Sequence, residues 1–235
     1  MDTNFRGFAS ENFILNIGKN GTQLKVPQDI LTKIPFFANA LNSGRFEETK
    51  KKVFDLPEDD PQAVADVIYF TYADSVNPIF PQVSLAEAQQ VDAYIRAWIQ
   101  ADKFKAEKAA NILVDRIVEF HDDTPVEPRE LDLLSKAGHE HSALYDVLVA
   151  ELGWLINVGT YSKTGSAYSL HEYEEIDFDS ACAELSKEDL LRLMKVVRQC
   201  TTDNLSPTTR AISDPCAYHK HDLTEPSKDC IPDDE

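Results

Sequence analysis

The sequence is poor in glycine, in cysteine over most of its length, and in long apolar runs. Only 8 of the 235 residues are glycine, and no glycine-rich loop of the kind that cradles a phosphate or a dinucleotide is present. No segment approaches the roughly 20 apolar residues that span a bilayer, and the first residues lack the apolar region of a secretory signal. We therefore expect a protein of the cytoplasm, the nucleus or both, without a nucleotide-binding loop.

The four cysteines, Cys182, Cys200, Cys216 and Cys230, all fall in the last quarter of the chain. Free thiols in a cytosolic protein are the simplest interpretation. Cys216 lies close to His219, His221 and Cys230, and thiolates with imidazoles suit zinc. Structural zinc sites usually carry paired ligands on short knuckles, whereas this segment is acidic and broken by proline. We predict exposed tail residues here and no metal site.

Positive charge is scarce as well. Lys and Arg total 23 against 41 Asp and Glu, so the formal net charge is −18 and the isoelectric point is near 4.6. Such a surface repels phosphate backbones and anionic lipids, which disfavours direct binding to nucleic acid or to a membrane. A basic run, Lys50-Lys51-Lys52, lacks interleaved aromatic residues, and we interpret it as a solubilising loop or strand edge.

No arrangement of residues points to catalysis. His139 and His141 flank Glu140 between two expected helices, but a catalytic base needs a nucleophile or an orienting partner nearby. The signature motifs of serine hydrolases and zinc proteases are missing from the sequence. The acidic run 58–60 lacks the alternating ligands of a calcium loop. We predict a protein that is not an enzyme and that binds no cofactor.

What the sequence does contain is a regular order of short elements, with 43% hydrophobic residues to build a core. Residues 12–17 and 22–26 read as two strands joined by an Asn-Gly turn, which predicts a β-hairpin. Pro27 begins a short helix. Pro35 ends that helix and begins a second one that carries Phe36 and Phe37. We therefore expect two helices that meet at a sharp corner with aromatic rings packed there.

Further elements follow from turn residues and from helical periodicity. Residues 53–56 read as a short strand, and the acidic turn that follows places Asp60 as an N-cap before Pro61. A helix then carries apolar residues at Val64, Val67 and Ile68. Later helices are expected at about 92–104, 106–120, 128–137, 142–157 and 187–199, the last behind a capping box at 186–189. Residues 159–183 read as irregular.

We expect the apolar residues of these strands and helices to form a core. The predicted buried residues are Phe13, Leu15, Leu24, Ile30, Leu31, Phe36, Phe37, Leu41, Leu56, Val64, Ile68, Tyr72, Ile95, Ile99 and Leu113. We divide the chain into a flexible N-terminus at 1–10, a first domain at 11–122, a helical extension at 123–200 and a disordered acidic tail at 201–235.

The order of elements in the first domain resembles a BTB/POZ domain of the fungal type. The residues that carry the resemblance are FILNIGKNGTQLKVPQDILTKIPFFANAL, RFEETKKKVFDLPEDDPQAVADVIYFTYADSV and AYIRAWIQADKFKAEKAANILVDRIV. The resemblance implies an α+β BTB/POZ fold, in which a cluster of helices flanks a small mixed sheet, followed here by an all-α C-terminal extension. It also implies a non-enzymatic protein–protein interaction module that commonly self-associates, and a subset of the family serves as substrate adaptors for cullin-based E3 ubiquitin ligases.

Within this resemblance, Phe46-Glu47-Glu48 matches the hydrophobic–any–Glu element by which adaptors of this kind bind a cullin. We predict a partner surface near Phe46, Glu47, Glu48 and the acidic turn at Glu58 and Asp59, since an exposed aromatic ring can fill a pocket while carboxylates pair with basic residues. Alternatively, Phe46 packs on its own core and the glutamates are solvated. Three functions stay open: a cullin adaptor, a homo-oligomeric scaffold, and a transcriptional co-regulator without ligase function.

Overall fold

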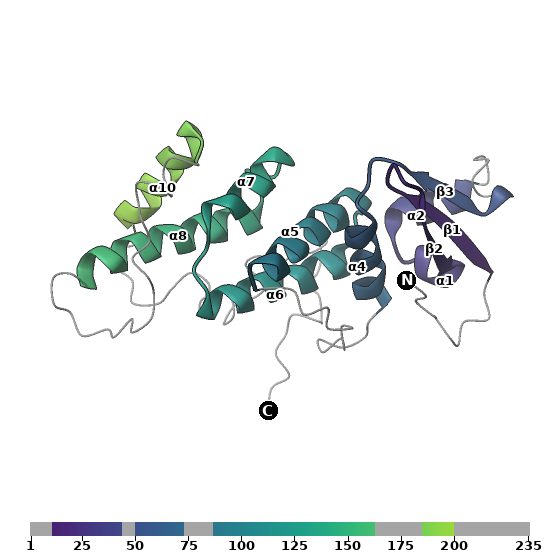
Figure 1. Cartoon of the computed structure of the whole chain (residues 1–235), viewed down its shortest axis with the longest axis horizontal. Coiled ribbons are helices and arrows are strands. Elements are labelled where there is room, and N and C mark those ends of the chain that lie inside the picture. The colour runs from purple at the N-terminus through teal and green to yellow at the C-terminus, as the bar shows by residue number, and fades with distance from the viewer. Residues whose placement is uncertain (1–10, 44–49, 73–86, 163–184, 200–235) are drawn as a thin grey trace, which may run out of the picture. The chain divides into compact units, whose positions relative to one another are not determined.

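The structure is a computed structural model that describes residues 11–43, 50–72, 87–162 and 185–199 (Figure 1). The chain forms two compact units, Met1–Leu113 and Val114–Glu235. The division falls within α6 (Glu107–Asp123), whereas the sequence suggested a boundary after residue 122. The predicted flexible N-terminus and the predicted disordered tail lie outside the described residues.

The first unit contains a three-stranded sheet built from β1 (Asn12–Ile17), β2 (Thr22–Pro27) and β3 (Val53–Leu56). The strand order is β2-β1-β3, with β1 antiparallel to β2 and parallel to β3. The predicted hairpin and the α+β class are therefore confirmed. The hairpin turn uses positive φ angles of 70° at Gly18 and 61° at Gly21, a conformation that glycine adopts without steric cost.

The two faces of this sheet differ as the alternation of the strands predicts. Phe13, Leu15 and Phe54 are among the buried side chains of one face. On the opposite face, the side chain of Asn16 accepts a hydrogen bond of 3.0 Å from Gln23 and donates one of 2.7 Å to Asp55. This polar ladder crosses all three strands, so only one face of the sheet belongs to the core.

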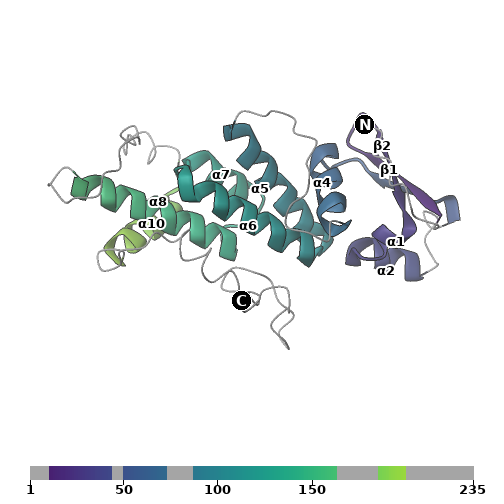
Figure 2. The same ribbon diagram turned by 90° about the horizontal axis from the view of Figure 1, so that it is seen from below.

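Helices α1 (Gln28–Leu31) and α2 (Pro35–Ser43) form the predicted proline corner near the sheet (Figures 1 and 2). Pro35 is the first residue of α2, as expected. Pro27 differs by one position: it is the last residue of β2 and the N-cap of α1. Its missing N–H is harmless there, because the strand ends at this residue and no helical bond requires it.

Helix α4 (Pro61–Tyr72) packs on α5 (Glu87–Phe104) within the same unit. Asp60 caps α4, since its Oδ1 accepts a 2.8 Å hydrogen bond from the Ala63 N–H. Helix α5 begins five residues before the predicted start. It ends at Phe104. The next residue, Lys105, has a φ of 57°, which allows the Lys105 N–H to bond Asp102 O and the Ala106 N–H to bond Ala101 O, the pairing of a Schellman motif.

The second unit contains the end of α6 together with α7 (Pro128–Lys136), α8 (Ala143–Ser162) and α10 (Lys187–Gln199). Helix α8 packs against α7 and α10. Most of its described side chains are buried, which explains its near-continuous apolar sequence. Residues 159–162 are helical, so the prediction of irregular structure from residue 159 was wrong there. None of the described helices combines the length and the apolar character needed to cross a bilayer.

Four of the predicted core residues lie outside the core. Phe36 is 40% exposed and Tyr72 is 38% exposed, while Leu41 and Ile99 are half-buried. The helical repeat explains Phe36, because neighbouring residues on a helix point about 100° apart and only Phe37 can face inward. Tyr72 is the last residue of α4, where the helix leaves the core. The other predicted core positions are buried.

Candidate partner-binding site

The structure describes only part of the predicted partner surface. Phe46, Glu47 and Glu48 lie outside the described residues. Glu58 is exposed, whereas Asp59, the next residue in the acidic turn, is only 7% exposed. The two carboxylates that the sequence grouped together therefore have different surroundings.

Asp59 is held inside the first unit by two contacts. Its carboxylate forms an ion pair with Lys103 near the end of α5, and its backbone N–H bonds Leu56 O at 3.2 Å. Gly18 also contacts this region, since its N–H donates a 2.9 Å hydrogen bond to Leu56 O. Asp59 thus fixes the turn on α5, and Glu58 is the member that faces solvent.

Aromatic rings connect α2 with the same end of α5. The Phe36 ring stacks on Phe104 with centroids 4.9 Å apart, and the Phe37 ring meets Phe104 edge-on at 5.1 Å. Phe37 also contacts Phe54 of β3 at 5.2 Å. Because Phe104 directly follows Lys103, the exposed ring of Phe36 and the acidic turn are attached to one end of α5. The sequence did not predict the contact between Phe36 and Phe104, because Phe36 was expected to be buried in the core.

Asp66, on α4, is a further carboxyl group whose pKa differs from its ordinary value. Burial raises the pKa of Asp66 to about 6. The 2.8 Å hydrogen bond donated by Gln62 acts in the opposite direction, and the nearby charge of Asp60 raises the pKa further. Asp66 therefore changes charge near neutral pH, unlike an ordinary surface aspartate.

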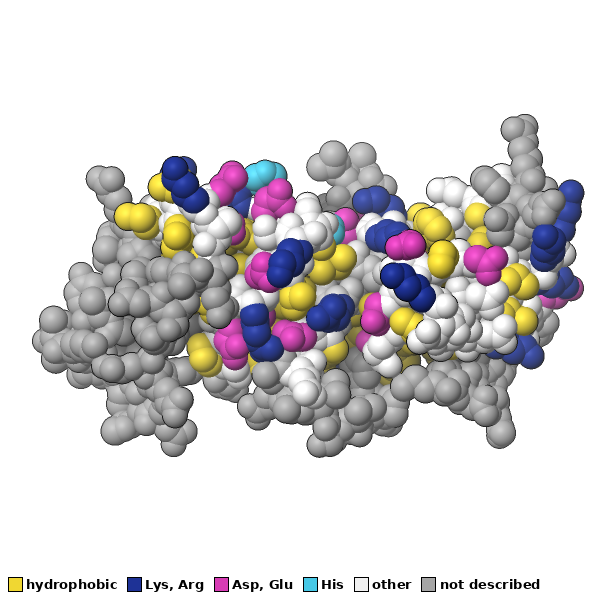
Figure 3. Space-filling view, turned by 45° about the horizontal axis from the view of Figure 1, so that its top comes forward, with side chains coloured by type: hydrophobic (Ala, Val, Ile, Leu, Met, Phe, Trp, Pro, Cys, Tyr) yellow, Lys and Arg dark blue, Asp and Glu magenta, His cyan; other side chains and the backbone are white. Residues whose placement is uncertain are grey.

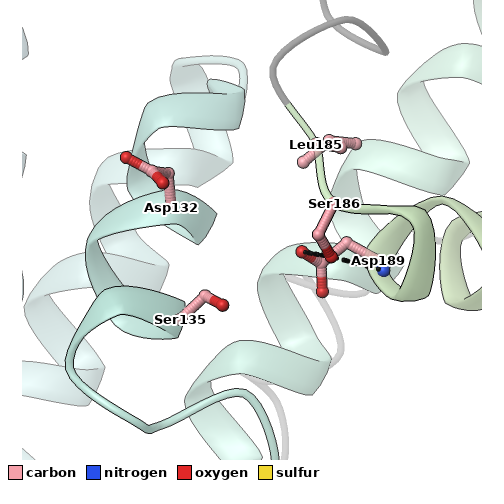
Figure 4. Close-up of a pocket in the computed structure, with 5 residues that line it drawn as sticks. All are labelled: Asp132, Ser135, Leu185, Ser186 and Asp189. Carbon is pink, nitrogen blue, oxygen red and sulfur yellow. Dashed lines mark hydrogen bonds between the residues drawn. The ribbon is translucent and has the colours of Figure 1, made fainter.

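The second unit contains a polar cavity of about 230 Å³ between α7 and the start of α10 (Figure 4). Five residues line it: Asp132, Ser135, Leu185, Ser186 and Asp189. The carboxylates are already engaged, since Asp132 pairs with Lys136 at 2.6 Å and Asp189 accepts hydrogen bonds from the hydroxyls of Tyr145 and Ser186. The lining contains no imidazole and no thiol.

The contacts around Tyr145 fix α10 on α8. Burial raises the pKa of the Tyr145 phenol, and its hydrogen bond to Asp189 adds to the shift, so the phenol stays a donor. The Arg192 guanidinium lies over the Tyr145 ring, 5.6 Å from its centroid, and also contacts Glu140 O and His141 Nδ1. The sequence indicated the capping role of Ser186, and its Oγ does accept the Asp189 N–H at 3.1 Å.

The described residues thus offer a surface with an exposed aromatic ring and acidic groups in the first unit. No group of three or more His, Cys, Asp or Glu side chains among those residues is placed to hold a metal ion. His139 and His141 lie in the loop between α7 and α8, and His141 contacts Arg192. Comparison with models of protein families, with curated proteins and with solved structures gave no match in any of the three.

Proposed function

We propose that the chain is a protein–protein interaction module of the BTB/POZ type that serves as a substrate adaptor for a cullin-based E3 ubiquitin ligase. The observation that supports this most is the order of elements in the first unit. A hairpin leads into a proline-cornered helix pair, and β3 then returns parallel to β1 before α4 begins. This order and this mixed sheet are what the resemblance implies for residues 11–122.

The geometry of the end of α5 supports the assignment of a partner surface. Phe36 exposes two fifths of its side chain while its ring rests on Phe104, so the ring is held in place before any partner binds. A preorganised aromatic side chain loses little conformational entropy on binding. Glu58, in the turn that Asp59 anchors to Lys103, supplies a carboxylate for a basic residue on the partner.

The test is capture of a cullin by the tagged full chain. The double variant Phe46→Ala/Glu48→Ala and the single variant Phe36→Ala should each lower the captured cullin by at least about tenfold, the effect expected for a contact that dominates an interface. Tyr72→Ala, which truncates an exposed aromatic side chain on α4, is the matched control and should leave capture unchanged. Equal capture by all variants would refute the assigned surface.

The same preparation separates the proposal from the other two functions. If the chain is a homo-oligomeric scaffold, light scattering should give the molar mass of an oligomer, and the chain should capture no cullin. A transcriptional co-regulator predicts a DNA-binding partner among the captured proteins. Absence of any cullin from the captured proteins would refute the adaptor proposal.

A further inference from the structure

Helix α10 has two faces of different character. Its inner face carries Asp189 and Leu193, which are buried, and the helix packs on α8. Its outer face carries Leu191 and Met194, which are 52% and 67% exposed. These are the two most exposed large hydrophobic side chains among the residues that the structure describes, and they lie three positions apart on one helix face.

Two lysines border this pair of apolar side chains. Lys187 lies four residues before Leu191 and Lys195 lies four residues after it, so the three share one row along the helix. All three are exposed. Figure 3 shows yellow and dark blue side chains next to each other over α10, at the upper left. In a chain of net charge −18, this face combines apolar area with positive charge at both ends.

The outer face is held in a fixed position by contacts on the inner side. Tyr145 of α8 bonds Asp189, and Arg192 reaches the carbonyl of Glu140 in the loop between α7 and α8. Ser186 caps the first turn of the helix. These bonds lie on both sides of Leu191 in the sequence, so a partner would meet a preformed face and would lose less entropy on binding.

We infer that the outer face of α10, which we define by Lys187, Leu191, Met194 and Lys195, binds an acidic amphipathic helix of another protein. Apolar side chains of that helix cover Leu191 and Met194, and its carboxylates pair with the two lysines. Eight residues of helix span about 12 Å, so the two carboxylates lie about two turns apart on the partner.

Charge argues against a second copy of α10 as the occupant. In an antiparallel pair of α10 helices centred on Leu191, Lys187 of one copy faces Lys195 of the other, and like charges that face each other repel. An acidic helix removes this repulsion and gains an ion pair at each end. The inference uses only residues of the second unit, so it stands or fails independently of the cullin proposal.

The experiment selects partners for the purified full chain from a phage-displayed library of random 16-residue peptides. The expected result is enrichment of peptides with net negative charge, in which acidic residues flank apolar residues at helical spacing. An enriched peptide should then bind the double variant Leu191→Ser/Met194→Ser at least about tenfold more weakly, because truncated anchor residues dominate such losses. Lys187→Glu/Lys195→Glu should weaken it similarly, and the weakening should shrink at high salt.

Matched controls use exposed residues of the first unit. Tyr72→Ser and Lys33→Glu change an exposed apolar side chain and an exposed lysine, and should leave peptide affinity unchanged. All substituted positions on α10 are exposed, and unchanged circular dichroism shows that the variants fold. The inference is wrong if no peptide is enriched, if enriched peptides show no acidic bias, or if the α10 variants bind them normally. It is equally wrong if the enriched peptides match residues 201–235 or α10 itself, because the occupant would then be this chain.

Discussion

Asp59 and Lys103 show how unequally the two ends of one ion pair can be buried. The Asp59 side chain is 5% exposed and the Lys103 side chain is 50% exposed. A lysine that loses its partner can turn its ammonium group into water, whereas a buried carboxylate cannot leave its site. Removing Lys103 should therefore lower the free energy of unfolding more than removing the charge of Asp59.

We expect Lys103→Met to lower the free energy of unfolding by about 1–3 kcal/mol, since it leaves a buried carboxylate without a counter-charge. Asp59→Asn should cost about 1 kcal/mol or less, because the freed lysine becomes an ordinary surface side chain. Urea denaturation followed by the fluorescence of Trp98, in a Trp154→Phe background, measures both. A larger loss for Asp59→Asn than for Lys103→Met would contradict this account.

Asp66 gives a prediction about pH. Its pKa is about 6 in the folded chain and near 4 when unfolded. Below pH 4 the carboxyl is protonated in both states and has no effect. Between pH 4 and pH 6 the unfolded chain releases the proton while the folded chain retains it, so stability falls as the pH rises.

The variant Asp66→Asn removes this titration and keeps an acceptor oxygen for Gln62. We expect it to match the parent chain near pH 4 and to exceed it by up to about 3 kcal/mol above pH 6. Urea midpoints at pH 4, 5 and 7.5 measure the difference. A difference that does not grow with pH would show that the carboxyl is ionised equally in both states.

At this scale, the sequence predicts local features and misses distant ones. The N-cap at Asp60 and the turn at Gly21 depend on neighbouring residues, and both were correctly predicted. The contacts of Asp59 with Lys103 and of Tyr145 with Asp189 each join residues 44 positions apart. Such contacts leave no periodic pattern in the sequence, so only the folded chain reveals them.

At the scale of elements, the helices depend on local sequence and are predictable, whereas the junctions between them depend on contacts that the sequence does not reveal. Helix types and most starts could be predicted from periodicity and proline positions, because both act within a few residues. The junction between α6 and α7 could not. It contains His121 and Glu130, whose side chains are 0% and 1% exposed and lie 3.1 Å apart.

This buried pair connects the end of α6 to the beginning of α7. His121 Nδ1 lies 3.0 Å from Thr124 O, and because a carbonyl only accepts, this nitrogen carries the donated hydrogen. The Nε2 nitrogen lies 3.1 Å from Glu130 Oε2 but makes no hydrogen bond to a described residue. That oxygen accepts the Glu127 N–H at 3.2 Å, which completes a capping bond for α7. Each of the two side chains therefore makes one hydrogen bond to the backbone of the junction between α6 and α7.

We expect His121→Leu to cost about 1–3 kcal/mol, since it removes the imidazole from Thr124 O and from the buried Glu130 carboxylate, which keeps the Glu127 N–H and the Arg129 guanidinium as partners. Glu130→Leu should also destabilise the second unit. The double variant should be less destabilised than the sum of the two single variants by about 0.5–3 kcal/mol, because the contact between the two side chains is lost only once. Urea denaturation followed by Trp154 fluorescence in a Trp98→Phe background supplies the double-mutant cycle. Strict additivity would show that the two side chains do not interact.

At the scale of the whole molecule, the two compact units each contain a tryptophan. Trp98 lies in α5 and is 2% exposed, and Trp154 lies in α8. Each unit also has its own buried apolar residues, for example Phe37 in the first and Leu148 in the second, both 0% exposed. Chains of this size with separate cores often unfold in more than one step. The two tryptophans can therefore report on the two units separately.

We expect Phe37→Ala to destabilise the first unit by about 3–5 kcal/mol and to lower the urea midpoint reported by Trp98, while the Trp154 midpoint stays where it is. Leu148→Ala should do the reverse, with a cost of about 2–5 kcal/mol. Both variants are measured in the two single-tryptophan backgrounds. The division between the units falls within helix α6. If either variant shifted both midpoints equally, the chain would unfold as one cooperative structure and the two units would not be independent.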